Sequence, residues 1–158
     1  MAVHEARLGP SWRPFFGLNG TTALLVVRDP DAADHVVRRL AATECRVVVA
    51  RSTEDALARL RSARPDVVVS ELELPDGDGI RLMRRLRART PADGGTTPAV
   101  ALLSPTSHHL ATRALLAGYQ AAIAFDATAI ELLLAVADAH GRHVGRADAG
   151  PRARTLAS

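Results

Sequence analysis

The carboxylate of Glu71 has the setting in this sequence that best suits chemistry. It follows the apolar run at residues 67–69 and precedes a Pro-Asp-Gly-Asp-Gly turn at residues 75–79. An acidic group that ends a buried parallel strand lies at the edge where α/β proteins bind their ligands. Arg28 and Asp29 end another apolar run in the same way. Three roles fit Glu71: a reactive carboxylate, a metal ligand, or a residue that has lost such a role and forms an ion pair.

Other groups with chemical potential have weaker support. The histidines form pairs without a cysteine or a spaced acid beside them, which favours surface positions over a metal site, at His108, His109, His140 and His143. The single cysteine, Cys45, precedes an apolar run and is expected at the edge of the core. No glycine-rich phosphate loop follows the first apolar run. We therefore expect no enzyme activity, no metal and no cofactor.

The elements that must position these groups alternate in type along the chain. Apolar runs rich in β-branched residues predict five buried strands, at residues 22–27, 46–50, 66–71, 99–104 and 121–125. An amphipathic segment follows each run, and the helices are expected to begin or end at Ser52, Asp78, Gly118 and Thr128. This alternation predicts an α/β fold, a doubly wound five-stranded parallel sheet with helices on both faces.

The distribution of charge divides the chain into three parts. All 20 basic residues are arginines, and residues 21–141 hold 14 of them against 15 acidic residues, a net charge of −1. Residues 142–158 carry a net charge of +3, so we expect a folded domain at 21–141, an N-terminal extension at 1–20 and an Arg-rich flexible tail. No aromatic residue interleaves the tail arginines, so we do not expect nucleic acid as a partner. No apolar run spans a membrane, and a cytoplasmic protein is expected.

Residues 23–138 resemble the receiver domain of two-component response regulators. The stretch LLVVRDPDAADHVVRRL is similar to the family's first strand and helix, and RPDVVVSELELPDGDGIRLMRRLR is similar to its third strand, loop and third helix. The stretches TPAVALLS and LLAGYQAAIAF are similar to its last two strands. The resemblance implies the flavodoxin-like (βα)5 fold with strand order 2-1-3-4-5. It also implies a role in phosphorelay signal transduction.

The same resemblance identifies a degenerate phosphorylation pocket. A working receiver phosphorylates an Asp after the third strand, binds Mg²⁺ with that Asp and an acidic pair after the first strand, and ends its last two strands with Thr or Ser and with Lys-Pro. The residues at these positions are Arg28, Asp29, Glu71, Leu103 and Phe125. A slip of one residue would instead bring Ser104 to the hydroxyl position. The missing lysine is no slip, because the chain contains none.

These replacements predict a pseudo-receiver that works without Asp phosphorylation. Arg28 would place a cation in the metal cavity and form a fork with Glu71 or Asp29, and the longer Glu71 side chain would displace its carboxylate from the in-line position. Phe125 would replace a cation with an apolar plug. No Mg²⁺ binding is expected. A Glu71 that permanently mimics the phosphorylated state is the alternative to a plain ion pair.

The expected function is signal transduction by an atypical, stand-alone receiver through a protein partner or a homodimer. Two other functions remain open. One is a response regulator that is still phosphorylated on Asp29, Asp76 or Asp78. The other is an adaptor that binds nucleic acid through the tail at residues 142–158.

The surface expected to carry the signal is on the last helix. Spacing of i, i+3, i+4 and i+7 predicts that Ile130, Leu133, Leu134 and Ala137 cover the sheet, which leaves Leu132 and Val136 as a second apolar stripe. Receivers commonly pair through their fourth helix, fifth strand and fifth helix. The expected interface therefore consists of Leu132, Val136, His108 and Ala122, the last at the family's aromatic switch position. The alternative is that one of the terminal segments folds over this stripe.

Overall fold

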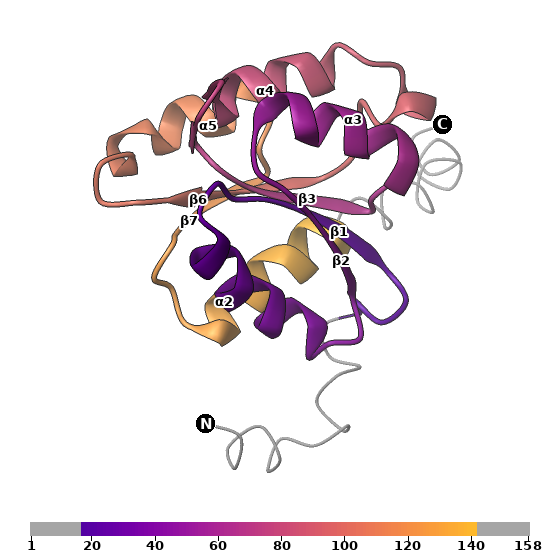
Figure 1. Cartoon of the computed structure of the whole chain (residues 1–158), viewed down its shortest axis with the longest axis vertical. Coiled ribbons are helices and arrows are strands. Elements are labelled where there is room, and N and C mark those ends of the chain that lie inside the picture. The colour runs from indigo at the N-terminus through magenta and orange to yellow at the C-terminus, as the bar shows by residue number, and fades with distance from the viewer. Residues whose placement is uncertain (1–16, 142–158) are drawn as a thin grey trace, which may run out of the picture.

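The computed structural model describes residues 17–141, which include all five predicted strands. The tail at 142–158 and most of the N-terminal extension lie outside the described residues. The strands pair in one parallel sheet in the order β2-β1-β3-β6-β7 (Figure 1). Their bounds are Thr22–Val26 for β1, Arg46–Ala50 for β2, Val67–Glu71 for β3, Ala99–Leu103 for β6 and Ala121–Ala124 for β7. The predicted fold class and strand order are therefore confirmed.

Five helices of the described chain cover the two faces of the sheet. Figure 1 shows α2 and the helix at residues 129–141, the C-terminal helix, on one face, and α3, α4 and α5 on the other. The bounds are Pro30–Ala41 for α2, Thr53–Ala63 for α3, Gly79–Arg87 for α4 and Ala111–Ala117 for α5. Two short 3-10 helices, η2 at Pro91–Asp93 and η3 at His108–Leu110, precede β6 and α5. None of the described helices is long and apolar enough to cross a bilayer.

The core has two halves because successive residues of a strand point to opposite faces of the sheet. Leu24 and Val68 belong to the cluster beneath α3, α4 and α5, whereas Leu25 and Val69 belong to the cluster beneath α2 and the C-terminal helix. All four side chains are at most 1 % exposed. The central strands are buried on both faces, which is why they read as continuous apolar runs.

The helix ends follow the predicted capping residues. The Ser52 hydroxyl accepts a hydrogen bond from the Asp55 N–H at 3.1 Å, and the Asp78 carboxylate accepts one from the Arg81 N–H at 2.6 Å. Thr128 and Glu131 bond reciprocally, in a capping box that begins the C-terminal helix. These caps satisfy N–H groups that have no partner inside their helices.

A short hairpin after β3 was not predicted. The strands β4, at Glu73–Leu74, and β5, at Gly77–Asp78, form a two-stranded antiparallel ladder around the expected turn. Leu74 is buried and packs in the cluster beneath α3, α4 and α5. The loop after β3 is therefore held against the domain, and this fixes the backbone next to Glu71.

Candidate functional site

Glu71 ends β3 at the carboxyl edge of the sheet, as predicted, and its side chain is half-buried. One carboxylate oxygen accepts a hydrogen bond of 2.6 Å from the backbone N–H of Arg28. Burial raises the pKa of Glu71, while that N–H and the nearby Arg28 charge oppose the rise. The carboxylate is thus tied to the backbone that follows β1, and this oxygen is already engaged.

The predicted fork between the Arg28 guanidinium and Glu71 is not formed. The Arg28 side chain instead lies near Glu73, with 4.0 Å between Nη2 and Oε2, and the two side chains are 55 % and 40 % exposed. The reason is geometric: Glu71 is bonded to the backbone of Arg28, which leaves the long side chain to point outward. An ion pair as exposed as this one contributes little to stability.

We predict that Arg28→Ala changes the free energy of unfolding by less than about 0.5 kcal/mol. The variant keeps the backbone N–H that bonds to Glu71, and the ion pair that it loses is exposed. Glu71→Ala removes the acceptor and is expected to cost about 1 kcal/mol. Urea unfolding of the two single variants and the double variant measures both effects. A coupling energy above about 1 kcal/mol between the two positions would contradict the backbone-mediated contact.

A chain of hydroxyl groups lies beside this pocket. Ser104 Oγ is 2.9 Å from Thr106 Oγ1 and 3.2 Å from Ser107 Oγ, and Thr106 donates to a Glu73 carboxylate oxygen at 2.6 Å. The loop after β6 is therefore joined to the loop after β3. Glu73 and Thr106 were not singled out from the sequence, because their contact spans 33 residues.

Leu103 and Phe125 bring apolar groups to the ends of the last two strands. Leu103 is 3 % exposed and packs in the cluster beneath α3, α4 and α5. Phe125 is half-buried and packs against the cluster beneath α2 and the C-terminal helix. Its backbone N–H bonds to the Leu103 carbonyl at 2.7 Å, which aligns the two strand ends.

Three aspartates near the pocket accept hydrogen bonds at helix N-termini. Asp29 Oδ2 accepts from the Ala32 N–H at 2.9 Å and caps α2, and Asp78 caps α4. Asp76 accepts from the N–H groups of Thr53 and Glu54, at 2.7 and 3.0 Å. These bonds lower the pKa of Asp76 because they favour its charged form. Asp76 thereby ties the loop after β3 to α3, a role that the sequence did not indicate.

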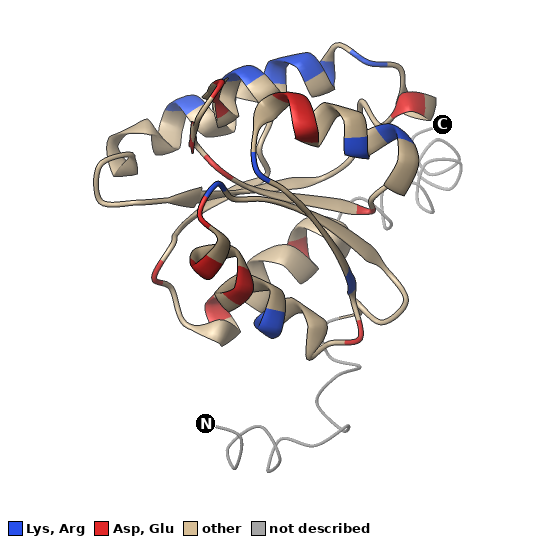
Figure 2. Ribbon diagram, viewed as in Figure 1, with Lys and Arg blue, Asp and Glu red and all other residues tan. Residues whose placement is uncertain are grey.

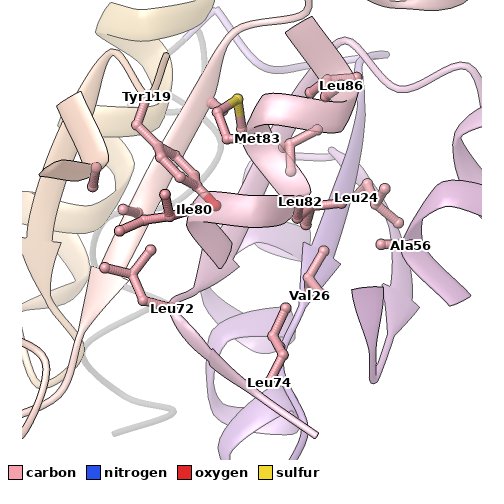
Figure 3. Close-up of a cluster of buried hydrophobic side chains, with 14 of the residues drawn as sticks. Leu24, Val26, Ala56, Leu72, Leu74, Ile80, Leu82, Met83, Leu86 and Tyr119 are labelled. Carbon is pink, nitrogen blue, oxygen red and sulfur yellow. The ribbon is translucent and has the colours of Figure 1, made fainter. Parts of the chain in front are cut away.

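Tyr119 joins the first turn of α4 to the segment between α5 and β7. Its hydroxyl is buried and donates to the Gly79 carbonyl at 2.8 Å, and burial raises its pKa. Figure 3 shows the Tyr119 ring beside Ile80 in the cluster beneath α3, α4 and α5. A Cβ at Gly79 would lie 2.6 Å from the Glu71 carbonyl oxygen and 2.9 Å from the Tyr119 hydroxyl, so only glycine fits there. The end of β3 and the start of α4 are therefore packed against each other.

The structure corrects the face of the C-terminal helix. Leu132 is 2 % exposed and Val136 is fully buried, so the prediction that they form an exposed stripe is wrong. Ile130 and Leu134, which were expected to cover the sheet, are 59 % and 57 % exposed. The reason is that the helix is rotated about its axis relative to the predicted face. Of the other two interface residues, His108 is exposed in η3 and Ala122 is half-buried in β7.

The fold and site define a class of protein. A doubly wound parallel sheet, with an acidic residue at the end of the central strand β3 and a second acidic residue after β1, is the arrangement of a flavodoxin-like receiver. The chain belongs to the response regulator receiver domain family, whose model matches residues 24–137. It is thus a receiver domain of two-component signal transduction.

Three bacterial proteins are similar to parts of this chain. The chain is 40% identical over 89 residues to the DNA-binding transcriptional activator DevR/DosR of Mycobacterium tuberculosis, covering 56% of this chain and 39% of that protein. It is 39% identical over 66 residues to the transcriptional regulatory protein AfsQ1 of Streptomyces coelicolor, covering 41% and 29%. An uncharacterized 14.6 kDa protein of Leptolyngbya boryana is 30% identical over 110 residues, with 70% and 82% covered. The chain thus spans less than half the length of the two named regulators.

Solved structures share the fold. A putative response regulator from Chloroflexus aurantiacus has a TM-score of 0.72 at 25% identity, covering 77% of this chain and 98% of that one. The receiver domain of the sensor histidine kinase PA1611 from Pseudomonas aeruginosa, which has a magnesium ion coordinated in its active-site cleft, has a TM-score of 0.70 at 24% identity, with the same coverage.

Proposed function

We propose that this receiver domain signals without phosphorylation, through contact with a protein partner or a second copy of itself. The observation that carries the proposal is the absence of lysine from the chain. The family resemblance places Phe125 where a working receiver has the lysine that binds a phosphoryl oxygen. An apolar ring offers no charge to that oxygen, so the electrostatic part of phosphoryl transfer is lost.

The geometry around Glu71 supports this proposal. Its Oε1 accepts a hydrogen bond from Arg28, and Leu103 lacks the hydroxyl that the family has at that position. Phosphorylation of another aspartate, on Asp29, Asp76 or Asp78, would disrupt a helix cap, because each carboxylate accepts backbone N–H bonds. The domain is proposed to have no enzyme activity of its own.

The residues of this site do not fit Mg²⁺. The ion requires several oxygen ligands in near-octahedral geometry. Among the described residues no group of three His, Cys, Asp or Glu side chains is arranged to hold a metal ion. Of the two carboxylates at the family's metal positions, Glu71 bonds to the Arg28 N–H and Asp29 caps α2. No step in the proposed function passes through a metal.

Exposed apolar side chains support signalling by contact. In the described part of the chain, the exposed large apolar residues all lie on α5 and the C-terminal helix, at Leu115, Leu116, Ile130 and Leu134. These two helices flank β7 in sequence, and β7 is an edge strand of the sheet. We call the three residues Leu115, Ile130 and Leu134 the β7 edge. Large apolar side chains that remain exposed on these two helices favour a protein interface.

We predict that acetyl phosphate with Mg²⁺ leaves the mass of the intact protein unchanged, because the pocket lacks the acceptor and the lysine. Mass spectrometry after incubation measures this, and the PA1611 receiver domain is a control for the reagent. Addition of one phosphoryl group would contradict the proposal. Peptide mapping of such an adduct to Asp29, Asp76 or Asp78 would favour the alternative of a response regulator that uses another aspartate.

A further inference from the structure

The charges of the described chain are unevenly divided between the two helical layers. Figure 2 shows arginines gathered along α4, whereas α2 carries two aspartates and two arginines. Helix α4 carries Arg81, Arg84, Arg85 and Arg87 and no acidic residue within its nine positions. Only Arg85 has an acidic partner among the ion pairs of the described residues, Glu54 at 2.6 Å. The α4 surface thus has a cationic character that the fold does not neutralise.

A cavity of about 500 Å³ lies between α4 and α5. It is lined by Arg84, Arg87, Ala88, Arg113, Leu116 and Ala117, and we call it the α4–α5 groove. Arg87 donates its guanidinium bonds to backbone carbonyls, whereas Arg84 and Arg113 are exposed. The groove therefore presents two available guanidinium groups beside two alanines.

Leu116 gives the groove an apolar component. Its side chain is 83 % exposed, more than any other large apolar residue of the described chain. A nucleic acid does not suit this groove. Its phosphate backbone has no apolar group that could cover Leu116, and the groove has no aromatic ring on which a base would stack. The mixture of charge and apolar surface favours a protein ligand.

We propose that the α4–α5 groove binds an acidic segment of another protein, in which a large apolar side chain lies beside the carboxylates. The carboxylates would pair with Arg84 and Arg113, and the apolar side chain would cover Leu116. This inference rests on the proposed function, signalling by contact, and names a surface and a partner chemistry for it.

Selection from a library of short random peptides tests the groove, with the full chain as bait. We expect the selected peptides to combine Asp or Glu with Leu, Ile or Phe, and to bind less tightly as salt rises. In fluorescence anisotropy, Arg84→Glu with Arg113→Glu is expected to weaken the best peptide by about tenfold or more. Leu116→Ser is expected to weaken it separately.

A matched control carries the same change in net charge elsewhere. Arg38→Glu with Arg61→Glu alters exposed arginines outside the groove and should leave peptide affinity within about twofold at moderate salt. The proposal is overturned if no peptide is enriched, if the selected peptides lack acidic residues, or if both double variants lose binding equally.

Two further outcomes also overturn it. A short DNA duplex that binds as tightly as the best peptide, and is lost with the groove variant, would assign the groove to nucleic acid. Self-association in sedimentation that is lost with the same variant would assign it to a second copy. If one of these outcomes is found and acetyl phosphate still transfers no phosphoryl group, the binding role of the groove is refuted. The proposed function, signalling without phosphorylation, then still stands.

Discussion

Leu132→Glu is expected to unfold the domain, whereas Leu134→Glu, two residues away, is expected to fold normally. Leu132 is 2 % exposed and packs in the apolar cluster beneath the C-terminal helix, where a carboxylate would lose its hydration. Burying an unpaired charge and removing a packed leucine together cost more than about 4 kcal/mol, much of the stability of an ordinary domain. Leu134 is 57 % exposed, so its replacement is expected to cost less than about 1 kcal/mol.

Circular dichroism and urea unfolding of the two variants measure this difference. If Leu134→Glu unfolds and Leu132→Glu remains stable, the assigned face of the C-terminal helix is wrong. Because Leu134→Glu keeps the fold, it also tests the β7 edge. Loss of self-association in sedimentation, or of a partner in native co-purification, is the expected effect there.

Arg87→Met is expected to lower the free energy of unfolding by about 2–4 kcal/mol. The guanidinium donates to the carbonyls of Gly95, Thr97 and Gly118, at 3.0, 2.6 and 2.7 Å, and so joins α4 to the loops before β6 and β7. Burial lowers the pKa of Arg87, because a partly buried guanidinium loses hydration. Methionine keeps much of the apolar stem and removes every donor, so three carbonyls lose their partner.

A planar fork is needed for this role, so Arg87→Lys is expected to restore only part of the loss. Arg84→Met is the matched control, because Arg84 lies on the same helix with an exposed side chain, and its effect should be within about 0.5 kcal/mol of zero. Urea midpoints compare the three variants. An Arg87→Met protein as stable as the Arg84→Met protein would contradict this prediction. It would show that the three hydrogen bonds add no stability beyond what bonds to water supply.

The fold could be predicted from the sequence because its signals are local. Apolar runs such as residues 67–69 indicate strands that are buried on both faces, and Ser52, Asp78 and Thr128 cap helices at the expected places. Alternation of strands and helices leaves few topologies for a parallel sheet. The short ladder of β4 and β5 was missed because two-residue strands have no periodicity to detect.

The face of the C-terminal helix could not be predicted from spacing. Large apolar residues occupy positions 130, 132, 133, 134 and 136, so two faces satisfy the rule for an amphipathic helix. The buried face differs from the predicted one by about 100°, one residue on an α-helix. Leucines that remain exposed at an edge of the sheet carry the same pattern as core residues, and only the packing tells them apart.

The residues of the site were predicted more reliably than their bonds. Glu71 and Arg28 do lie together, but through a backbone N–H, because the direction of a long side chain is not encoded in strand spacing. Tyr119 and the contact of Asp76 with α3 were not predicted, because their partners are 40 and 23 residues away. Contacts at such separations depend on how elements pack, which a single sequence does not reveal.

Calorimetric titration with Mg²⁺ in the presence of beryllofluoride tests the central claim most directly. The account predicts no saturable heat, because Glu71 already accepts from the Arg28 N–H, Asp29 caps α2 and the chain has no lysine. The PA1611 receiver domain, whose structure holds Mg²⁺, is the matched positive control. A fitted site of one ion per chain, lost in Glu71→Ala, would contradict signalling without phosphorylation.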